Sequence, residues 1–578
     1  VALDESYDYK VDPARPVAPG DVVRVPLGPK DRTGIVWDDP INESLDEARL
    51  KPVIERYDVP PLPAGLRKFI DWVARYTVSP RGQVLRMSLA TPDLFREPPR
   101  QKAYELTGVE PERMTGARER VMETLRAGPP RAQGDLAEAA GVSPSVIKGL
   151  EDQGVVRALF LPSPERRSYE PPRPDLQGPS LSKGQAAAAA VLRESVAQGG
   201  YETTVLEGVT GSGKTEVYFE AVAEALRAAE DSQVLVLVPE IALTGQLLSR
   251  FEKRFGAAPV AWHSDMTPAE RRRAWHGVRS GAARVVVGAR SALFLPFTGL
   301  RLIVVDEEHD SSYKQEDGVL YHARDMAVVR ATMEECAAIL SSATPSLETL
   351  VNVWEGKYAH VHLPERHGGA TLPEIRTIDM RAADIEPRRW LSGPMVRAMG
   401  ATLEAGEQVL LFLNRRGYAP AAICRACGHR LEHEACSTPL VVHQYGNRLR
   451  CHHCAYAIPM PHACPECGEE EAIRAWGPGV ERLEEEVNSR FPDKTVGLMT
   501  SDTISSAARA EDFIARIIEN EFDVVIGTQL VTKGHHFPML TLVGIVDGDM
   551  GLSSGDLRAA ERTYQQLWQV SGRAGRAA

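Results

Sequence analysis

The sequence has no long hydrophobic run and no excess of basic charge. No stretch of about 18 consecutive apolar residues occurs, so the chain is not expected to cross a membrane. The first residues also lack the charged-then-apolar layout of a secretion signal, which predicts a cytoplasmic location. The formal net charge of −12 argues against nucleic-acid binding over the whole surface, although one groove can still gather basic residues.

Cysteine is nearly absent outside one segment. Of the eight cysteines, Cys336 stands alone in an apolar run and is predicted to be a core residue, while the other seven lie between Cys424 and Cys467. In a reducing compartment that density indicates metal binding rather than disulfides. Most of the seven form C-x2-C pairs, each of which offers two zinc ligands from one tight turn, and Cys436 stands apart.

The length predicts several domains. At 578 residues the chain is too long to fold around a single hydrophobic core, and about three or four domains are expected. Residues 1–95 alternate short β-like runs with turns before a helical pattern at 66–75, which indicates a small β-rich module. Residues 166–180 belong to a proline-rich stretch and predict a linker.

Residues 96–165 predict a winged-helix domain. Apolar spacing over 135–156 indicates two short helices, with Gly141 in the turn, Ser143 at the N-cap of the second helix, and the first residues of a wing after it. The second helix offers one lysine against two acids, so recognition of base sequence is disfavoured. A spacer, a protein contact or a weak contact with the DNA backbone fits better.

Apolar strand-like runs alternate with helical stretches from residue 181 onward. Continuous apolar strands between helices indicate parallel sheets covered on both faces. The runs form two series, which predict two α/β lobes at 181–365 and 366–578 with a nucleotide cleft between them. The runs are 234–238, 284–287, 302–305 and 337–340 in the first series, and 409–413, 523–526 and 542–546 in the second.

A glycine-rich loop follows a short β-rich run and opens an apolar-periodic helix. Its sequence, Gly208-Val-Thr-Gly-Ser-Gly-Lys-Thr215, fits the G-x4-G-K-[ST] pattern of a P-loop. Backbone N–H groups near Gly208, Gly211 and Gly213 can surround phosphates, Lys214 can reach the β and γ phosphates, and the Thr215 hydroxyl can hold Mg²⁺. A plain glycine-rich turn is the alternative, but the strand-loop-helix context favours nucleotide binding.

Two acids at a strand end suit nucleotide hydrolysis. The apolar run at 302–305 leads into Asp306, which would hold Mg²⁺, and Glu307, which would orient or deprotonate the attacking water. The alternative is an acidic turn at the end of a strand. Ser342-Ala-Thr, after the next strand, could sense the γ-phosphate and link the two lobes.

Residues at both ends of the lobe region would complete the site. Arg573 and Arg576 lie three apart on one side of a helical turn and could neutralise transition-state charge across the cleft. A solvated basic helix end is the alternative. Gln185, upstream of the P-loop, could read the adenine.

The order of these motifs is that of superfamily 2 helicases. Longer strings resemble the PriA family of bacterial replication-restart helicases (primosomal protein N′) through nearly the whole chain. These strings are Gly208–Tyr218, Pro239–Leu243, Asp306–Gln315, Tyr321–Asp325 and Leu413–Pro420.

The resemblance implies the architecture and the activity. It implies a multidomain α/β chain with two RecA-like lobes and a two-zinc insertion at about 422–475. The implied activity is ATP-dependent unwinding with 3′→5′ polarity at abandoned forks and D-loops, followed by help in reloading the replicative helicase. Implied partners are single-stranded and forked DNA with a 3′ end, single-strand-binding protein and helicase-loading factors. A monomer associated with the nucleoid is expected.

The resemblance also divides the metal ligands between two zinc sites. PriA proteins carry four C-x2-C pairs, and here His433-Glu-Ala-Cys436 fills the place of the second pair. Both sites would be structural, because closed ligand sets leave no position for a water molecule. The alternative for His433 is an exposed histidine beside a degraded three-cysteine site. The implied sets are Cys424, Cys427, Cys464 and Cys467 for one zinc, and His433, Cys436, Cys451 and Cys454 for the other.

The N-terminal module resembles the family's domain for binding DNA 3′ ends. Tyr7 could stack on a terminal base, and Asp8 could accept a hydrogen bond from the 3′-hydroxyl. The implied pocket positions are Tyr7, Asp8, Gly28 and Lys51, and the implied contacts elsewhere are Tyr313, Lys314 and Lys533.

Four positions depart from the family pattern on the side that would contact DNA. They are Ala289, Val319, Val480 and His536, where the family has threonine, tryptophan, threonine and aspartate. Two hypotheses follow: an active DNA-dependent helicase, or a fork-binding assembly platform that binds nucleotide but unwinds poorly. A remodeller or nuclease lacks support from the zinc and N-terminal strings. PriA proteins also continue into a further C-terminal domain, which this sequence is expected to lack.

Overall fold

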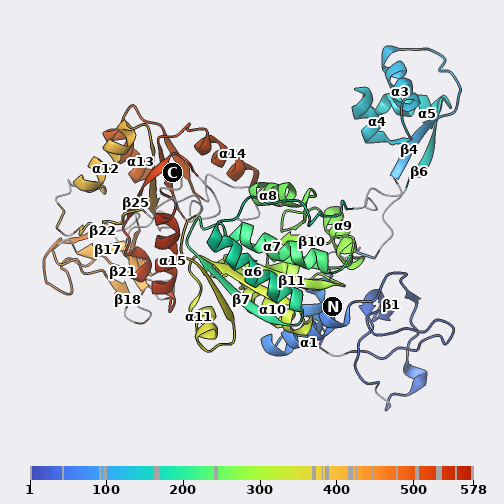
Figure 1. Cartoon of the computed structure of the whole chain (residues 1–578), viewed down its shortest axis with the longest axis horizontal. Coiled ribbons are helices and arrows are strands. Elements are labelled where there is room, and N and C mark those ends of the chain that lie inside the picture. Colours follow the sequence, from blue (N-terminus) through green and yellow to red (C-terminus); the bar gives the residue numbers. More distant parts are fainter. Residues whose placement is uncertain are drawn as a thin grey trace.

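A computed structural model of the chain shows two α/β lobes, with an N-terminal module and a small helical module beyond the first lobe (Figure 1). None of the helices it describes is long and apolar enough to cross a membrane. The described residues are 3–4, 6–41, 44–89, 94–95, 101–161, 169–239, 245–366, 373–380, 382–383, 389–413, 421–424, 426–433, 435, 438–443, 448–451, 454, 456–476, 480–500, 507–528, 537–553 and 556–574.

The first lobe is built on a seven-stranded sheet in the order β15-β7-β14-β11-β8-β10-β9, and every pairing in it is parallel. Its strands are β7 (Glu202–Gly208), β8 (Gln233–Leu237), β9 (Val260–Trp262), β10 (Val285–Gly288), β11 (Leu300–Asp306), β14 (Ala337–Ser342) and β15 (Ala359–Leu363). Its helices are α6 (Lys183–Gln198), α7 (Lys214–Ala228), α8 (Gly245–Phe255), α9 (Pro268–Arg279), α10 (Ala323–Met333) and α11 (Leu347–Trp354).

Both faces of this sheet are buried, which explains its continuous apolar strands. Side chains alternate along a strand, so in β11 Leu302 and Val304 pack in the core with α6, α7 and α8, while Ile303 and Val305 pack in the core with α9 and α10. Because the strands are parallel, their carboxyl ends lie at one edge. The strand order then brings the loop after β7, the end of β14 and the acids after β11 together.

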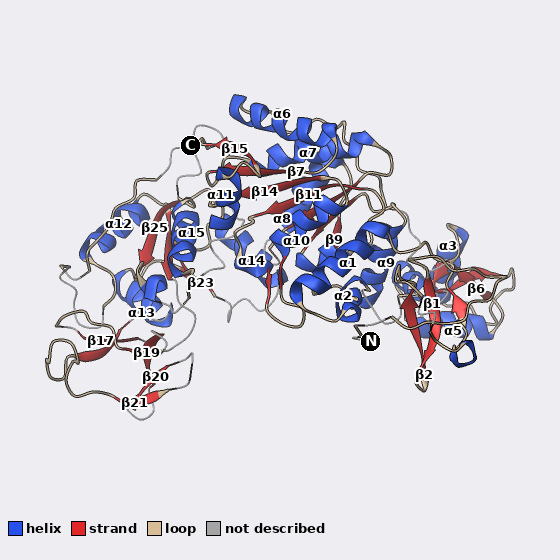
Figure 2. Cartoon of the chain, turned by 90° about the horizontal axis from the view of Figure 1, so that it is seen from below, coloured by secondary structure: helices blue, strands red, loops and turns tan. Residues whose placement is uncertain are grey.

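The second lobe carries a four-stranded parallel sheet in the order β23-β24-β16-β25. An antiparallel insertion lies between β16 and α13, at the end of the molecule away from the first lobe (Figure 2). The elements of the lobe are α12 (Gly393–Glu404), β16 (Gln408–Leu413), α13 (Val480–Arg490), β23 (Val496–Met499), α14 (Ala507–Ile518), β24 (Val524–Gly527), β25 (Leu540–Val546) and α15 (Ala559–Ser571). The strands of the insertion are β17 (Ala421–Cys424), β18 (Glu432–His433), β19 (Thr438–His443), β20 (Arg448–Cys451), β21 (Ala457–Pro459) and β22 (Ile473–Trp476).

The helical module consists of three helices and a small antiparallel sheet in the order β5-β4-β6. The two predicted short helices are confirmed, and Gly141 between them has φ 59°, in the left-handed region that favours glycine. Ser143 does precede the second helix, but its hydroxyl bonds to Ser145 and forms no cap with the backbone. The name winged helix stays a prediction. The elements are β4 (Gln101–Leu106), α3 (Gly116–Arg126), β5 (Arg131–Ala132), α4 (Gln133–Ala140), α5 (Pro144–Asp152) and β6 (Val156–Leu161).

The N-terminal module consists of a small sheet and two helices whose apolar residues belong to the core of the first lobe. The sheet, in the order β2-β1-β3, is antiparallel. Apolar residues of α1, Phe69 among them, share one cluster with Trp275 and Phe294 of the first lobe. The Phe69 and Phe294 rings lie 5.3 Å apart, and Trp275 Nε1 donates to Ser88 O at 2.7 Å. The elements are β1 (Val22–Leu27), β2 (Lys30–Ile35), β3 (Glu55–Arg56), α1 (Ala64–Thr77) and α2 (Arg81–Ser88).

Truncating Phe69 is therefore expected to destabilise the first lobe, and not the N-terminal sheet alone. Phe69→Ala should lower the free energy of unfolding of the lobe by about 3–5 kcal/mol, because it opens a cavity in the shared core. The urea dependence of hydrogen exchange in β11 and α10 measures this loss. Tyr76→Ala, on the exposed face of the same helix, is the matched control. Unchanged exchange in β11 would show that α1 is not part of this core.

Candidate nucleotide site, zinc-ligand clusters and DNA-binding module

The P-loop has the compact form that binding of phosphate requires. β7 ends at Gly208 and α7 begins at Lys214. Gly211 and Gly213 have φ 84° and 79°, backbone angles that residues other than glycine rarely adopt. Lys214 Nζ donates to Gly208 O at 2.8 Å, so the ammonium group lies across the mouth of the loop. With the N-terminus of α7 behind it, the loop presents N–H groups and a positive charge to an anion.

Gln185 lies beneath this loop. It is 3% exposed, and its Nε2 donates to Ser212 O at 2.8 Å while its Oε1 accepts from Ser182 N at 2.9 Å. The second bond belongs to a capping box at the start of α6. The Ser-x-x-Gln signature of that box was present in the sequence and predicts this role. Gln185 thus supports the P-loop, and its reading of adenine stays a prediction.

Asp306 and Glu307 lie at the end of β11, as the sequence predicted. Asp306 Oδ1 accepts from Ser341 Oγ at 2.9 Å, and its Oδ2 accepts from Tyr218 OH at 3.1 Å. Burial and the charge of Glu307 raise the pKa of Asp306, whereas Lys214 lowers it. Glu307 has φ 49°, a left-handed conformation that costs a non-glycine residue on the order of 1–3 kcal/mol and is typical of functional sites.

The third acid of the same motif, Glu308, has a structural role that the sequence did not reveal. Its carboxylate is completely buried and accepts from Arg324 Nη1 at 3.2 Å, Ser346 N at 2.7 Å and Thr349 Oγ1 at 3.0 Å. These bonds join the acid motif to the segment after Ser342-Ala-Thr and to the first turn of α10. A buried carboxylate with this many donors is well satisfied.

Helix α15 of the second lobe contacts the nucleotide motifs of the first. Gln569 Nε2 lies 2.6 Å from His309 Nε2 and 3.4 Å from Glu307 Oε2. Gly572 packs so closely on Thr210 of the P-loop that a Cβ atom there would overlap it. Arg573, the next residue, is 5% exposed. Arg573 at the end of this helix therefore lies next to the P-loop. Arg576 lies outside the described residues.

A pocket beside the P-loop could hold the base of a nucleotide. It has a volume of ≈ 150 Å³ and lies between α7, α8 and the segment that precedes α6. Two ion pairs line it: Arg250 with Glu216, and Arg254 with Glu220 at 2.8 Å.

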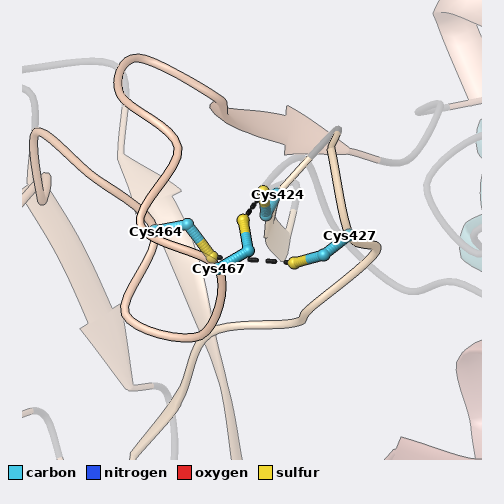
Figure 3. A group of neighbouring side chains, drawn as sticks. All are labelled: Cys424, Cys427, Cys464 and Cys467. Atoms are coloured by element: carbon cyan, nitrogen blue, oxygen red, sulfur yellow. Dashed lines mark hydrogen bonds between the residues drawn. The ribbon is translucent and has the colours of Figure 1, made fainter.

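Four cysteines of the insertion form one cluster with the geometry of a zinc site (Figure 3). Cys424 Sγ lies 3.7 Å from Cys467 Sγ, and Cys427 Sγ lies 3.7 Å from Cys464 Sγ. Tetrahedral zinc with Zn–S bonds of about 2.3 Å requires sulfur atoms about 3.8 Å apart, so the set fits the ion. The backbone N–H groups of Cys427 and Ala426 lower the pKa of Cys424 to about 7, whereas the neighbouring thiols raise the pKa of Cys427, so the thiolate is favoured at Cys424.

A second cluster contains His433, Cys451 and Cys454, whose ligand atoms all lie within 4.8 Å of one another. His433 Nδ1 is 3.3 Å from Cys454 Sγ, and the imidazole stacks on Tyr456 with ring centroids 4.2 Å apart. His433 is therefore held among the cysteines by its neighbour. Cys436, the fourth predicted ligand, lies outside the described residues.

Comparisons with known proteins identify the family. Family models match at residues 182–353 (DEAD/DEAH box helicase), 1–90 (3′DNA-binding domain) and 434–459 (PriA DNA helicase Cys-rich region domain). Replication restart protein PriA of Rickettsia felis is 38% identical over 98% of this chain and 76% of that protein. The chain belongs to the PriA family. The PriA protein of Haemophilus influenzae is 37% identical over 100% of this chain and 80% of its own length.

Family membership and the domain matches identify an ATP-dependent DNA helicase with a 3′-DNA-binding domain. The helicase domain uses nucleotide and magnesium. Among solved structures, the DUF1998 helicase MrfA bound to DNA is similar, with a TM-score of 0.41 and 15% identity over 71% of this chain and 48% of that one.

The segments that carry the implied 3′-end pocket of PriA proteins lie next to one another. Lys10 N donates to Lys51 O at 2.9 Å, and Tyr9 OH donates to Pro26 O at 3.1 Å beside the β1–β2 turn at Gly28. Tyr7, two residues before Tyr9, is 57% exposed. The module thus brings the segment around Tyr9 next to Pro26 and Lys51, with Tyr7 exposed, and the contacts with DNA stay a prediction.

Tyr313, which the resemblance implied as a DNA contact, is buried in the loop after the acid motif. This ring is 1% exposed, and its hydroxyl donates to Asp306 O at 2.6 Å, so it lies beneath the nucleotide site and not on a surface. Lys314 is exposed at the start of a small hairpin of β12 (Lys314–Gln315) and β13 (Tyr321–His322). Lys533 lies outside the described residues.

Two of the four departures from the PriA pattern are buried. Ala289 and Val319 are at most 6% exposed, and Val319 packs in the core of the first lobe with Tyr313 and Tyr321. At these two positions the change therefore affects packing rather than an exposed surface. Val480 is the first residue of α13, and His536 lies outside the described residues.

Proposed function

We propose that the chain acts in replication restart as a 3′→5′ DNA helicase, which binds abandoned forks and D-loops through a 3′ end and helps to reload the replicative helicase. The observation that carries this proposal is the contact of α15 with both the acid motif and the P-loop, because it assembles one site from two lobes. Such a site can link ATP hydrolysis to movement of the lobes.

The described residues divide the work of hydrolysis among them. The P-loop and Lys214 bind the phosphates, and Thr215 and Asp306 would hold Mg²⁺, which neutralises phosphate charge. Glu307 orients or deprotonates the attacking water. Arg573 stabilises the transition-state charge, together with Arg576, which lies outside the described residues.

Base recognition and DNA contact complete the proposed roles. The base would enter the pocket beside α7, and Gln185 would read the adenine. Tyr7, Asp8, Gly28 and Lys51 would bind the 3′ end, and Lys314 and Lys533 would contact the strand that is moved. The partners are single-strand-binding protein and helicase-loading factors, and the protein works as a monomer in the cytoplasm at the nucleoid.

The insertion would hold two structural zinc ions. The complete four-cysteine set and the placement of His433 against Cys454 support this count. Native protein should contain about two zinc equivalents per chain, and His433→Ala about one, because three thiolates leave the tetrahedral site incomplete. Elemental analysis of purified protein measures this. His443→Ala, at another histidine of the insertion, is the control. An unchanged count in His433→Ala would exclude His433 as a ligand.

Unwinding assays on synthetic forks test the proposed function. A fork whose nascent strand ends in a 3′-hydroxyl should be bound and separated in the presence of ATP, and a 3′-phosphate at that end should weaken binding, since Asp8 would then face an anion. Tight fork binding with no strand separation would contradict the helicase and favour the assembly platform. Separation only from a 5′ single-stranded arm would contradict the polarity.

A further inference from the structure

Arg366 lies at the start of the segment that connects the two lobes. It follows β15 by three residues, and β15 is itself attached to the P-loop, because Leu363 O accepts from Val209 N at 3.2 Å. The backbone around Arg366 is thus fixed beside the P-loop on the first lobe. No sequence motif described above includes this residue.

The guanidinium of Arg366 bonds to the turn that carries Arg573. Nη1 donates to Ala574 O at 2.9 Å, and Nη2 donates to Gly572 O at 3.1 Å, so the two bonds bracket Arg573. Arg366 is only 7% exposed. The two N–H donors of a rigid guanidinium fix both the distance and the orientation of the two carbonyl groups, whereas the single ammonium group of a lysine does not fix the orientation.

The same turn is held from its other side by the P-loop. Gly572 packs directly on Thr210, where any larger residue would overlap. The turn is therefore enclosed between Thr210 and Arg366, both of which belong to the nucleotide side of the first lobe. The backbone from which the Arg573 side chain extends is therefore fixed relative to the P-loop.

We propose that Arg366 is a positioning residue for ATP hydrolysis, which fastens the Gly572–Ala574 turn to the first lobe so that Arg573 reaches the transition state. The inference rests on the proposed ATPase and on the role of Arg573. Arg366 contacts the backbone of the turn, so it acts through the position of Arg573 and not by direct contact with the reacting atoms. Its loss should therefore slow the chemical step and leave the binding of ATP intact.

Steady-state ATPase assays on a DNA fork test this role. Arg366→Ala should lower kcat by about 10–100-fold, with KM for ATP within about twofold of the native value, since a small displacement of a catalytic group costs this much. Arg366→Lys should recover part of the loss, because it restores one of the two bonds. Arg376→Ala is the matched control, because Arg376 is an exposed arginine of the same connecting segment. It should behave as native protein.

A double substitution separates positioning from a general structural effect. If Arg366 acts through Arg573, the Arg366→Ala, Arg573→Ala protein should be no slower than Arg573→Ala alone. Multiplied losses would overturn the proposal, as would a native kcat in Arg366→Ala or a loss confined to KM. Circular dichroism and thermal melting show whether each variant is folded, and Arg366→Lys carries the test if the alanine variant does not fold.

Hydrogen exchange gives a readout that does not need catalysis. Amides at 568–574 should exchange faster in Arg366→Ala and not in Arg376→Ala, and unchanged exchange would overturn the inference. Native protein that hydrolyses no ATP on DNA would refute the proposed function, whereas active native protein with unaffected Arg366→Ala would refute only this inference.

Discussion

Replacing Arg573 with alanine is expected to lower kcat for ATP hydrolysis by about 10³-fold or more. Arginines that reach the transferred phosphoryl group across a cleft contribute about 10³–10⁵-fold in related nucleotide hydrolases. Arg573 follows Gly572, which packs on the P-loop residue Thr210, and its side chain is nearly inaccessible to solvent. Steady-state kinetics with saturating fork DNA measures the change. KM for ATP should change little, since the charge that Arg573 neutralises develops in the transition state.

Arg562→Ala is the control for this substitution. Arg562 belongs to the same helix, but its side chain is exposed and pairs with Asp556. It should retain native kinetics. Arg573→Lys should remain strongly impaired, because a lysine lacks the planar fork of arginine. Native kcat in Arg573→Ala would show that another group stabilises the transition state.

Replacing Glu307 with glutamine is expected to lower kcat by about 10²–10⁴-fold, the usual contribution of a general base. The substitution keeps the size of the side chain and removes the charge that would accept a proton from water. ATP and fork DNA should still bind, because the P-loop and the N-terminal module are unchanged. Single-turnover hydrolysis and fluorescent-nucleotide binding measure the two effects separately.

Glu316→Gln tests whether charge alone explains such a loss. Glu316 is an exposed acid in the hairpin loop ten residues from Asp306 along the chain, and its substitution should leave the rate intact. A normal rate of ATP hydrolysis in Glu307→Gln would show that another group acts as the general base. Loss of ATP binding in this variant would instead indicate that Glu307 maintains the site's structure.

The parts of the site that were predictable are those fixed by local sequence. The P-loop follows from glycines at left-handed positions, and the acid pair follows from an apolar strand that ends at Asp306. The parallel direction of the strands was also foreseeable, since continuous apolar runs indicate parallel strands whose carboxyl ends share an edge. The C-x2-C spacing predicted zinc ligands, and the resemblance to PriA proteins predicted which four cysteines form one cluster.

The parts that were not predictable depend on packing between distant segments. The apolar stripe of α1 shows that the helix is buried, but not that its partner is the core around Trp275. The pairing of Gln569 with His309 joins residues 260 positions apart. The resemblance to PriA proteins implied that Tyr313 contacts DNA, and only the fold shows that its ring turns inward.

Tyr313 also links the hairpin of β12 and β13 to the nucleotide site. Its hydroxyl holds the backbone of Asp306, and Arg290 Nη1 donates to Ser312 O at 2.7 Å on the same loop. Movement of the hairpin at Lys314 would therefore be passed through the neighbouring Tyr313 to Asp306, the proposed Mg²⁺ ligand. This route does not require an exposed aromatic residue at position 319, where valine is buried.

Fork-dependent ATP hydrolysis tests the central claim most directly, namely that this site is a motor coupled to DNA. The measurement compares turnover with and without a synthetic fork, in native protein and in Lys214→Ala. We expect the fork to raise turnover of native protein at least about tenfold. Lys214→Ala should lose about 10²–10³-fold of that rate, because the lysine stabilises phosphate charge. Tight fork binding with no increase in turnover of native protein would contradict the account.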